Sequence, residues 1–347
     1  MKPELPGPLP FTVAPHRAEA LYSWLTRLSD PYHLKPWQLL HELKVGTFAG
    51  RDARYQHPLH EFLTDPDLRN LAHQTRIDPS RITTDRPAPP DWLLASDEWR
   101  MQCHQCARED RRTGIAAYER LIWRDAAHTI CRRHAAPLVL EVVARSGEGA
   151  EETSPIELTV LERNVLAHLM RFESQIRGAW RGNAPVEAAG TLTAGEFLRV
   201  MQDLLTFAVG RWDAGRFPRA QTVEQQAYHL GFHAPTLFPR HQRKRSKYCH
   251  ERHQPMQLRH LADPAARRAA LWLVLQVIWY IPSGPPRLAL RLGVTPQDEF
   301  FGSRRHAGWA WLTERALAWP ARYRARHWHG FGDVTDTLKV QLTHLKG

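Results

Sequence analysis

Apolar residues recur along most of the chain with the three- and four-residue spacing of an amphipathic α-helix. The first predicted helix covers residues 16–29, and Pro31 prevents it from continuing. A second, shorter helix opens at Pro36. The inward positions predicted for these two helices are Leu21, Leu25, Leu28, Trp37, Leu40 and Leu43. The chain therefore begins, after a proline-rich lead, with a small helical domain.

Two segments have the pattern of a helix, a tight turn and a second helix. Residues 67–74 place Leu68 and Leu71 inward, residues 75–78 form a turn, and Pro79 opens a short helix. Residues 286–301 repeat this arrangement around a turn at 293–295. Both fit a helix-turn-helix, although any small helical domain can contain such a pair.

The second half of the chain has helical periodicity almost throughout. The expected helices cover 155–180, a segment opened by the capping box Thr193-x-x-Glu196, a shorter one opened by Thr222-x-x-Gln225, 264–281 and 309–323. No strand series occurs outside the middle segment, so the predicted class is mainly α. It comprises an N-terminal helical, helix-turn-helix-like domain, a small zinc-finger module, and a C-terminal helical domain with helix-turn-helix-like elements.

Two linkers divide this pattern. Residues 85–91 (DRPAPPD) and 146–155 (SGEGAEETSP) are poor in apolar side chains and rich in turn-forming or charged residues. The predicted domains are 1–90 (N-terminal helical), 91–145 (zinc-binding) and 155–347 (C-terminal helical).

Cysteine spacing supplies the strongest chemical signal. Cys103 and Cys106 form a C-x2-C pair, and Cys131 and His134 form a C-x2-H pair 24 residues later. Zn²⁺ takes four nitrogen or sulfur ligands in a tetrahedron, so the two pairs predict one structural ion. His128 is a weaker substitute for the fourth ligand, and His104 is left out. The alternative is a set of buried thiols beside chance histidines.

Between the two pairs, the chain carries residues suited to packing on the module. Tyr118, Leu121 and Ile122 have helical spacing, and Asp110 can pair with Arg120. Four protein ligands would leave no open position for a catalytic water. No phosphate-binding loop, metalloprotease motif or serine-hydrolase motif occurs, so we expect no enzymatic activity.

Net charge adds a second expectation. Lys and Arg number 47 against 36 Asp and Glu, which gives +11 and a pI near 9.9. Such an excess favours a polyanionic partner, although solubility alone could explain it. The predicted nucleic-acid contacts are Arg240, Arg243, Lys244, Arg245, Lys247, Arg304 and Arg305, with Arg132 and Arg133 as weaker ones. Cys249 is expected to be an ordinary thiol.

These motifs together carry a family resemblance. The helix at residues 20–28, Cys103-x2-Cys106-x2-Glu109-Asp110, Tyr118-x-Arg120-x2-Trp123 and Cys131-x2-His134-x2-Pro137-Leu138 resemble the TniQ family over about residues 5–140. This family is related to TnsD and selects targets for large bacterial transposons, including CRISPR-associated ones. The chain departs from it in lacking Cys-Pro knuckles and a second cysteine pair, so one zinc ion is expected.

The resemblance implies a non-enzymatic target-selection adaptor. Its partners would be an AAA+ ATPase of the TnsC/TniB kind, the transposase through that ATPase, and target DNA or a Cascade-type guide-RNA complex. A homodimer is also plausible. The alternative is a zinc-containing, sequence-specific transcription regulator.

Location is predicted from features that the chain lacks. The first fifteen residues contain no apolar signal segment, and the longest apolar run, 269–281, is shorter than a membrane span. Four cysteines do not make a disulfide framework, so we expect a cytoplasmic protein.

Overall fold

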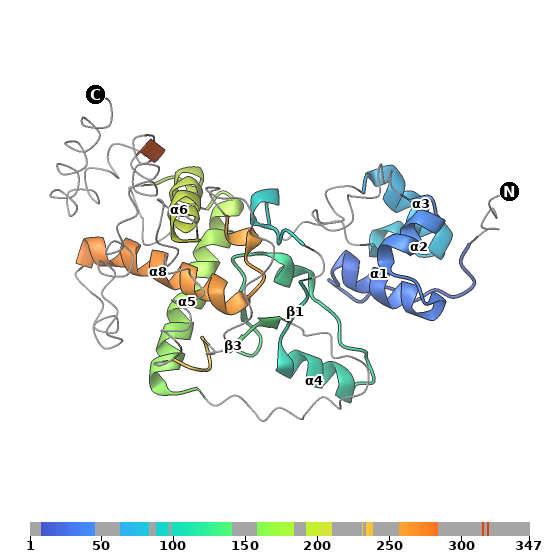
Figure 1. Cartoon of the computed structure of the whole chain (residues 1–347), viewed down its shortest axis with the longest axis horizontal. Coiled ribbons are helices and arrows are strands. Elements are labelled where there is room, and N and C mark those ends of the chain that lie inside the picture. The colour runs from blue at the N-terminus through green and yellow to red at the C-terminus, as the bar shows by residue number, and fades with distance from the viewer. Residues whose placement is uncertain are drawn as a thin grey trace, which may run out of the picture. The chain divides into compact units, whose positions relative to one another are not determined.

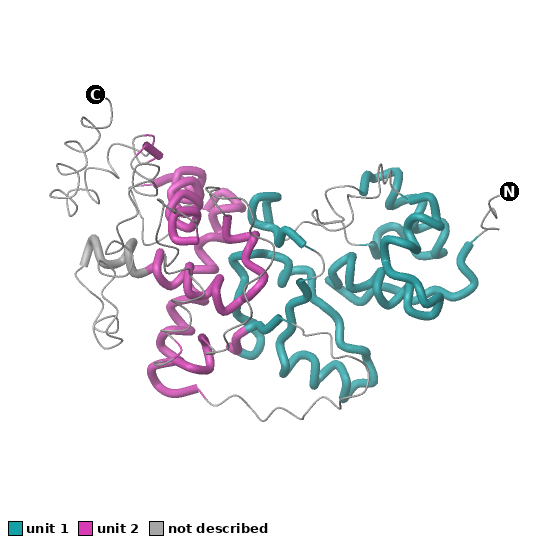
Figure 2. The backbone as a smooth tube through the Cα atoms, viewed as in Figure 1, with its two compact units in different colours: residues 1–134, 138–155 teal, residues 135–137, 156–347 magenta. Residues whose placement is uncertain are grey.

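A computed structural model of the chain is mainly helical (Figure 1). The residues that it describes are 8–45, 63–82, 88–96, 99–140, 158–183, 192–209, 231, 234–238, 257–283, 314–315 and 318. The chain divides into two compact units, which Figure 2 colours separately. One comprises residues 1–134 and 138–155, and the other comprises 135–137 and 156–347.

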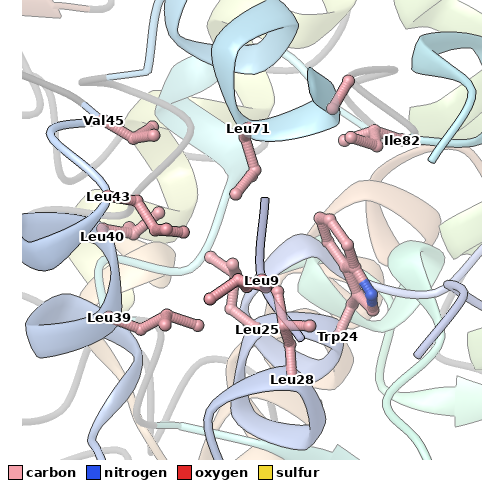
Figure 3. Close-up of a cluster of buried hydrophobic side chains, with 11 residues drawn as sticks. Leu9, Trp24, Leu25, Leu28, Leu39, Leu40, Leu43, Val45, Leu71 and Ile82 are labelled. Atoms are coloured by element: carbon pink, nitrogen blue, oxygen red, sulfur yellow. The ribbon is translucent and has the colours of Figure 1, made fainter. Parts of the chain in front are cut away.

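The N-terminal helices enclose one apolar core. Their bounds are α1 (Leu21–Ser29), η1 (Asp30–Tyr32), α2 (Pro36–Glu42), α3 (Asp65–Thr75) and the 3₁₀ helix η4 (Pro79–Arg81). Figure 3 shows the core side chains Leu9, Trp24, Leu25, Leu28, Leu39, Leu40, Leu43, Val45, Leu71 and Ile82. Trp24 also donates its indole N–H to the Val13 carbonyl at 2.7 Å, which fixes the proline-rich lead against α1.

Local signals explain where these helices begin and end. Pro36 occupies the first turn of α2, and the Thr64 hydroxyl caps α3 by accepting the Asp67 N–H. Arg76, in a left-handed conformation, ends α3. Helix α1 begins five residues later than predicted, because Glu19 pairs in extended conformation with Arg120.

Two details of the sequence prediction differ here. Trp37, assigned to the apolar stripe of α2, is 37% exposed, and Leu39 occupies the buried position instead. The second member of the predicted helix-turn-helix is only the three-residue η4, so the structure does not confirm that motif. A single 3₁₀ turn is too short to lie along a DNA groove as a recognition helix does.

Short elements build the segment that carries the cysteines. They are η5 (Pro90–Trp92), β1 (Met101–Gln102), α4 (His104–Arg112), η6 (Leu121–Arg124), β2 (Ile130–Cys131), β3 (Ala136–Pro137) and β4 (Val139–Leu140). Strands β1 and β4 pair antiparallel, with Met101 opposite Leu140. The helical spacing of Tyr118, Leu121 and Ile122 gives only the 3₁₀ helix η6, in which Trp123 is buried and Ile122 is 38% exposed.

A buried polar network joins α1 to this segment. The Ala20 N–H donates to the Glu119 carbonyl at 2.9 Å, and the Glu119 N–H donates to the Ser23 hydroxyl at 3.1 Å. The Glu119 carboxylate accepts the Met101 N–H at 2.8 Å and lies 3.9 Å from Arg124 Nη1. The backbone of Glu119 thus holds α1 to the cysteine-bearing segment, while its carboxylate braces that segment internally.

The other unit has a helical core. It comprises α5 (Val160–Trp180), α6 (Ala194–Val209), η7 (Leu258–His260) and α8 (Pro264–Ser283), and the three α-helices pack on one another. The predicted capping box of α6 is confirmed, because the Thr193 N–H donates to Glu196 at 2.7 Å and the Glu196 N–H donates to the Thr193 hydroxyl. A second capping box, Thr159-x-x-Glu162, opens α5 and is not among the sequence predictions.

Helix α8, which has the most apolar sequence of the unit, buries two arginines. Arg267 and Arg268 are fully buried in it. Arg268 donates from Nε to the Leu237 carbonyl at 2.8 Å, and burial lowers its pKa to about 10. Within the described part of the chain, no helix has the length and apolar character needed to cross a membrane.

Several predicted segments lie outside the described residues. These are the linker at 146–155, the capping box at 222–225, the second helix-turn-helix at 286–301 and most of the helix at 309–323.

Candidate metal centre

Four predicted ligands meet at the start of α4 and in the turn after β2. Cys103 is the N-cap residue of α4 and Cys106 lies in its first turn, while Cys131 ends β2 and His134 follows it. The hydrogen bond from the Leu138 N–H to the Thr129 carbonyl, 2.9 Å long, closes the chain around that turn. The four ligand atoms all lie within 4.8 Å of one another, and the three cysteines are buried.

The distances fit one tetrahedral ion. Ideal Zn–S and Zn–N bonds would place two sulfurs about 3.8 Å apart and a sulfur about 3.6 Å from the imidazole nitrogen. Cys106 Sγ lies 3.7 Å from Cys131 Sγ. His134 Nδ1 lies 3.3 Å from Cys106 Sγ, 3.5 Å from Cys103 Sγ and 3.7 Å from Cys131 Sγ. The set is therefore compatible with one structural metal ion bound by three sulfurs and Nδ1.

The thiols are not joined as disulfides. Cys103, Cys106 and Cys131 are free, and the 3.7 Å between Cys106 and Cys131 far exceeds a bonded pair of sulfurs. Hydrogen bonds from the thiols of Cys103 and Cys106 lower the pKa of Cys131, whereas hydrogen bonds with Cys103 and Cys131 raise the pKa of Cys106. A bound cation would favour the thiolate form of each cysteine.

Glu109, which the sequence predicts only as part of the family motif, lies directly behind His134. His134 Nε2 is 3.0 Å from Glu109 Oε1, and Arg133 Nη2 is 2.9 Å from Glu109 Oε2. The hydrogen bond from His134 lowers the pKa of Glu109. Its spacing from Cys106, three residues on a helix, was the available signal, because such residues share a face.

The neighbouring acid, Asp110, has a different partner. Arg120 donates from Nη2 to both carboxylate oxygens of Asp110, at 2.9 and 3.1 Å, which confirms the predicted pair. The Arg120 guanidinium also lies 4.7 Å from the ring centre of Tyr118 and 4.9 Å from that of Trp123. The middle motif of the sequence therefore forms one stack against α4.

Within the described part of the chain, the substitute ligand His128 does not join the cluster, although it is buried. His104, which the sequence prediction left out, is not part of the cluster either. Arg132 and Arg133 are exposed near the centre. The predicted nucleic-acid residues Arg240, Arg243, Lys244, Arg245, Lys247, Arg304 and Arg305, and also Cys249, lie outside the described residues.

An ion held by all four ligands would have no position left for water. Catalytic zinc sites keep such a position, whereas closed sites of this composition stabilise a fold. The chemistry available to this centre is therefore the bracing of α4 against the turn that carries His134.

Comparison with known proteins gives one match. The model of the TniQ family matches residues 10–138, an interval that contains the α1–α3 helices, all four ligands, Glu109 and Asp110. Neither the curated proteins nor the solved structures contain a match. The chain therefore carries a domain of the TniQ family over residues 10–138, as its motifs predicted.

Proposed function

We propose that this protein is a non-catalytic adaptor in DNA transposition. It links target DNA or an RNA-guided complex to an AAA+ transposition ATPase and, through that ATPase, to the transposase. The observation that carries the proposal is the TniQ match, because membership of this family suggests an adaptor role associated with transposition. The match covers the N-terminal helices and the metal centre together, so we assign the docking of the transposition machinery to that part of the chain.

The metal ion in this proposal is a single structural Zn²⁺ held by Cys103, Cys106, Cys131 and His134. Three buried sulfurs and one imidazole make a ligand set that favours Zn²⁺ over Mg²⁺ and Ca²⁺, because those two ions bind oxygen ligands. Binding of such an ion can contribute on the order of 10 kcal/mol to folding. This contribution suits a segment whose strands are only two residues long.

Nucleic acid is the proposed partner of the basic segments. The charge of +11 supports a polyanionic partner, and the run at 240–247 concentrates five Lys or Arg residues in eight positions. We therefore assign phosphate contacts to Arg240, Arg243, Lys244, Arg245 and Lys247, with Arg304 and Arg305 as further contacts. Both target DNA and a guide RNA present the same phosphate chemistry.

The proposal is tested by co-purification with a purified AAA+ ATPase of the TnsC/TniB kind, with and without DNA, alongside metal analysis by mass spectrometry. We expect capture of the ATPase and one zinc per chain. Cys131→Ser should lose zinc and capture together. His134→Cys is the matched control, because a four-cysteine site still binds zinc, and it should keep both.

Two outcomes would contradict the adaptor function. The first is failure of the zinc-loaded wild type to capture the ATPase in any condition. The second is tight, sequence-specific DNA binding without any effect on transposition, which would favour a transcription regulator.

A further inference from the structure

Behind the metal ligands lies a carboxylate, Glu109, to which neither the family match nor the ligand motif assigns a role. Glu109 is not a ligand itself, because His134 separates it from the three sulfurs: Nδ1 of the ring faces the sulfurs and Nε2 faces Glu109 Oε1 at 3.0 Å. An imidazole that binds a metal through one nitrogen carries its proton on the other, and that proton needs an acceptor. Glu109 is positioned to be this acceptor.

The fold places Glu109 there by helical geometry. Cys106 and Glu109 are three residues apart on α4 and therefore lie one turn from each other on the same face. A single helix thus supplies one metal ligand and, a turn later, the carboxylate that meets the ligand from the opposite pair. Asp110, the adjacent residue, points to Arg120 instead and takes no part in the contact with His134.

The second oxygen of Glu109 is also held. Arg133, the residue before His134, contacts Glu109 Oε2 at 2.9 Å, so consecutive residues of one turn engage the two oxygens of one carboxylate. The His134 side chain is only 12% exposed, whereas those of Glu109 and Arg133 are 40% and 66% exposed. The contact with His134 is therefore the more shielded of the two, and the contact with Arg133 lies in solvent.

We propose that Glu109 is the positioning residue of the metal centre: it fixes the His134 ring so that Nδ1 is the metal-binding nitrogen, and it thereby sets how tightly the ion is retained. The inference rests on the metal assignment made above. It gives the Glu-Asp step of the motif two separate roles, since Glu109 serves the metal ligand and Asp110 serves Arg120.

The test measures Zn²⁺ affinity of the full chain by competition with a chelating dye, together with the rate of Zn²⁺ release. Glu109→Ala should weaken Zn²⁺ binding about 10- to 100-fold, the range typical of losing such a partner, and should speed release. Arg133→Ala is the matched control from the same turn. It removes the exposed contact and keeps the Glu109–His134 bond, so its effect should be clearly smaller.

Repeating the Glu109→Ala measurement in the His134→Cys variant shows whether Glu109 orients the imidazole or only supports the fold. In His134→Cys there is no imidazole to orient, so adding Glu109→Ala should no longer weaken Zn²⁺ binding. An equal loss in both backgrounds would mean that Glu109 supports the fold and would overturn the proposal. Wild-type affinity in Glu109→Ala would also overturn it. Failure of the wild type to bind Zn²⁺ would overturn the metal assignment as well, whereas capture of the ATPase is measured independently of these variants.

Discussion

The buried pair of Arg124 and Glu119 offers the sharpest test of how the TniQ domain is held together. Their side chains are 4% and 1% exposed, and Arg124 Nη1 lies 3.9 Å from Glu119 Oε2. At that distance, with an effective dielectric constant of about 20, the attraction between unit charges is about 4 kcal/mol. Arg124 also donates to the carbonyls of Ser96 at 2.9 Å and Trp99 at 3.3 Å. Arg124→Met would remove all of these interactions and leave the Glu119 charge buried.

We therefore expect Arg124→Met to lower the local free energy of unfolding by about 3–5 kcal/mol, the usual cost of removing one partner from a buried ion pair. Hydrogen exchange of the zinc-saturated protein over residues 99–140 measures this quantity directly. Arg133→Met is the matched control, because Arg133 pairs with Glu109 while 66% exposed, and it should cost less than about 1 kcal/mol.

A double-mutant cycle with Glu119→Gln completes the test. The double variant buries no unpaired charge, so its loss should be smaller than the sum of the single losses, by about 1–3 kcal/mol. The reasoning is refuted if Arg124→Met costs as little as the exposed Arg133→Met, or if the two single losses simply add.

Three further predictions concern other parts of the chain. Glu162→Ala should destabilise α5 more than Thr159→Ala, which should cost about 1 kcal/mol, because the Glu162 carboxylate accepts two backbone N–H groups, at 2.9 and 2.8 Å. Burial alone would raise the pKa of Glu162, but those hydrogen bonds lower it from 4.5. The contribution of Glu162 to the free energy of unfolding should therefore be complete above pH 4.5 and fade as the pH falls through the lower folded-state pKa. Urea titrations of wild type and Glu162→Gln across this pH range would show the loss. Leu25→Ala, at a position with no exposed surface in the core of Figure 3, should cost about 2–5 kcal/mol in chemical denaturation, and a cost below 1 kcal/mol would contradict the packing described. Removing zinc with a chelator should abolish exchange protection in α4 and leave that of α5 unchanged, since all four ligands belong to the first unit; equal loss in both helices would contradict this division.

The sequence predicted those parts of the fold that depend on local rules. Helical spacing located α1, α2 and α3, and Thr193 with Glu196 located the start of α6, because periodicity and capping act within one or two turns. The extra turn predicted at the start of α1 failed for a nonlocal reason. Residues 18–20 pair with a segment about a hundred positions later, and that pairing holds Glu19 in an extended conformation.

The metal centre also has a part that local spacing predicts and a part that depends on distant residues. Cysteine and histidine spacing identified the four residues that the structure brings together, because each pair comes from a single turn. The role of Glu109 required the approach of two turns that are distant in the sequence: its spacing from Cys106 indicates a shared helix face but not His134 as its partner. For Trp37, local spacing was misleading. Its position fits the helical periodicity of the apolar face predicted for α2, yet Trp37 is partly exposed and Leu39 is buried in the core instead.

The pairing of Glu19 with Arg120 also fixes an order of events during synthesis. Ser23 and Glu119, which bond to each other, are separated by 96 residues, so on a ribosome adding about 5–20 residues per second α1 waits roughly 5–20 s for its partner segment. Until then, the start of α1 has neither the Glu119 carbonyl nor the Arg120 backbone to pair with. Helix α1 can therefore pack on α2 and α3 before its N-terminal edge finds a partner. A nascent chain released before residue 121 would present that unpaired edge to chaperones and proteases.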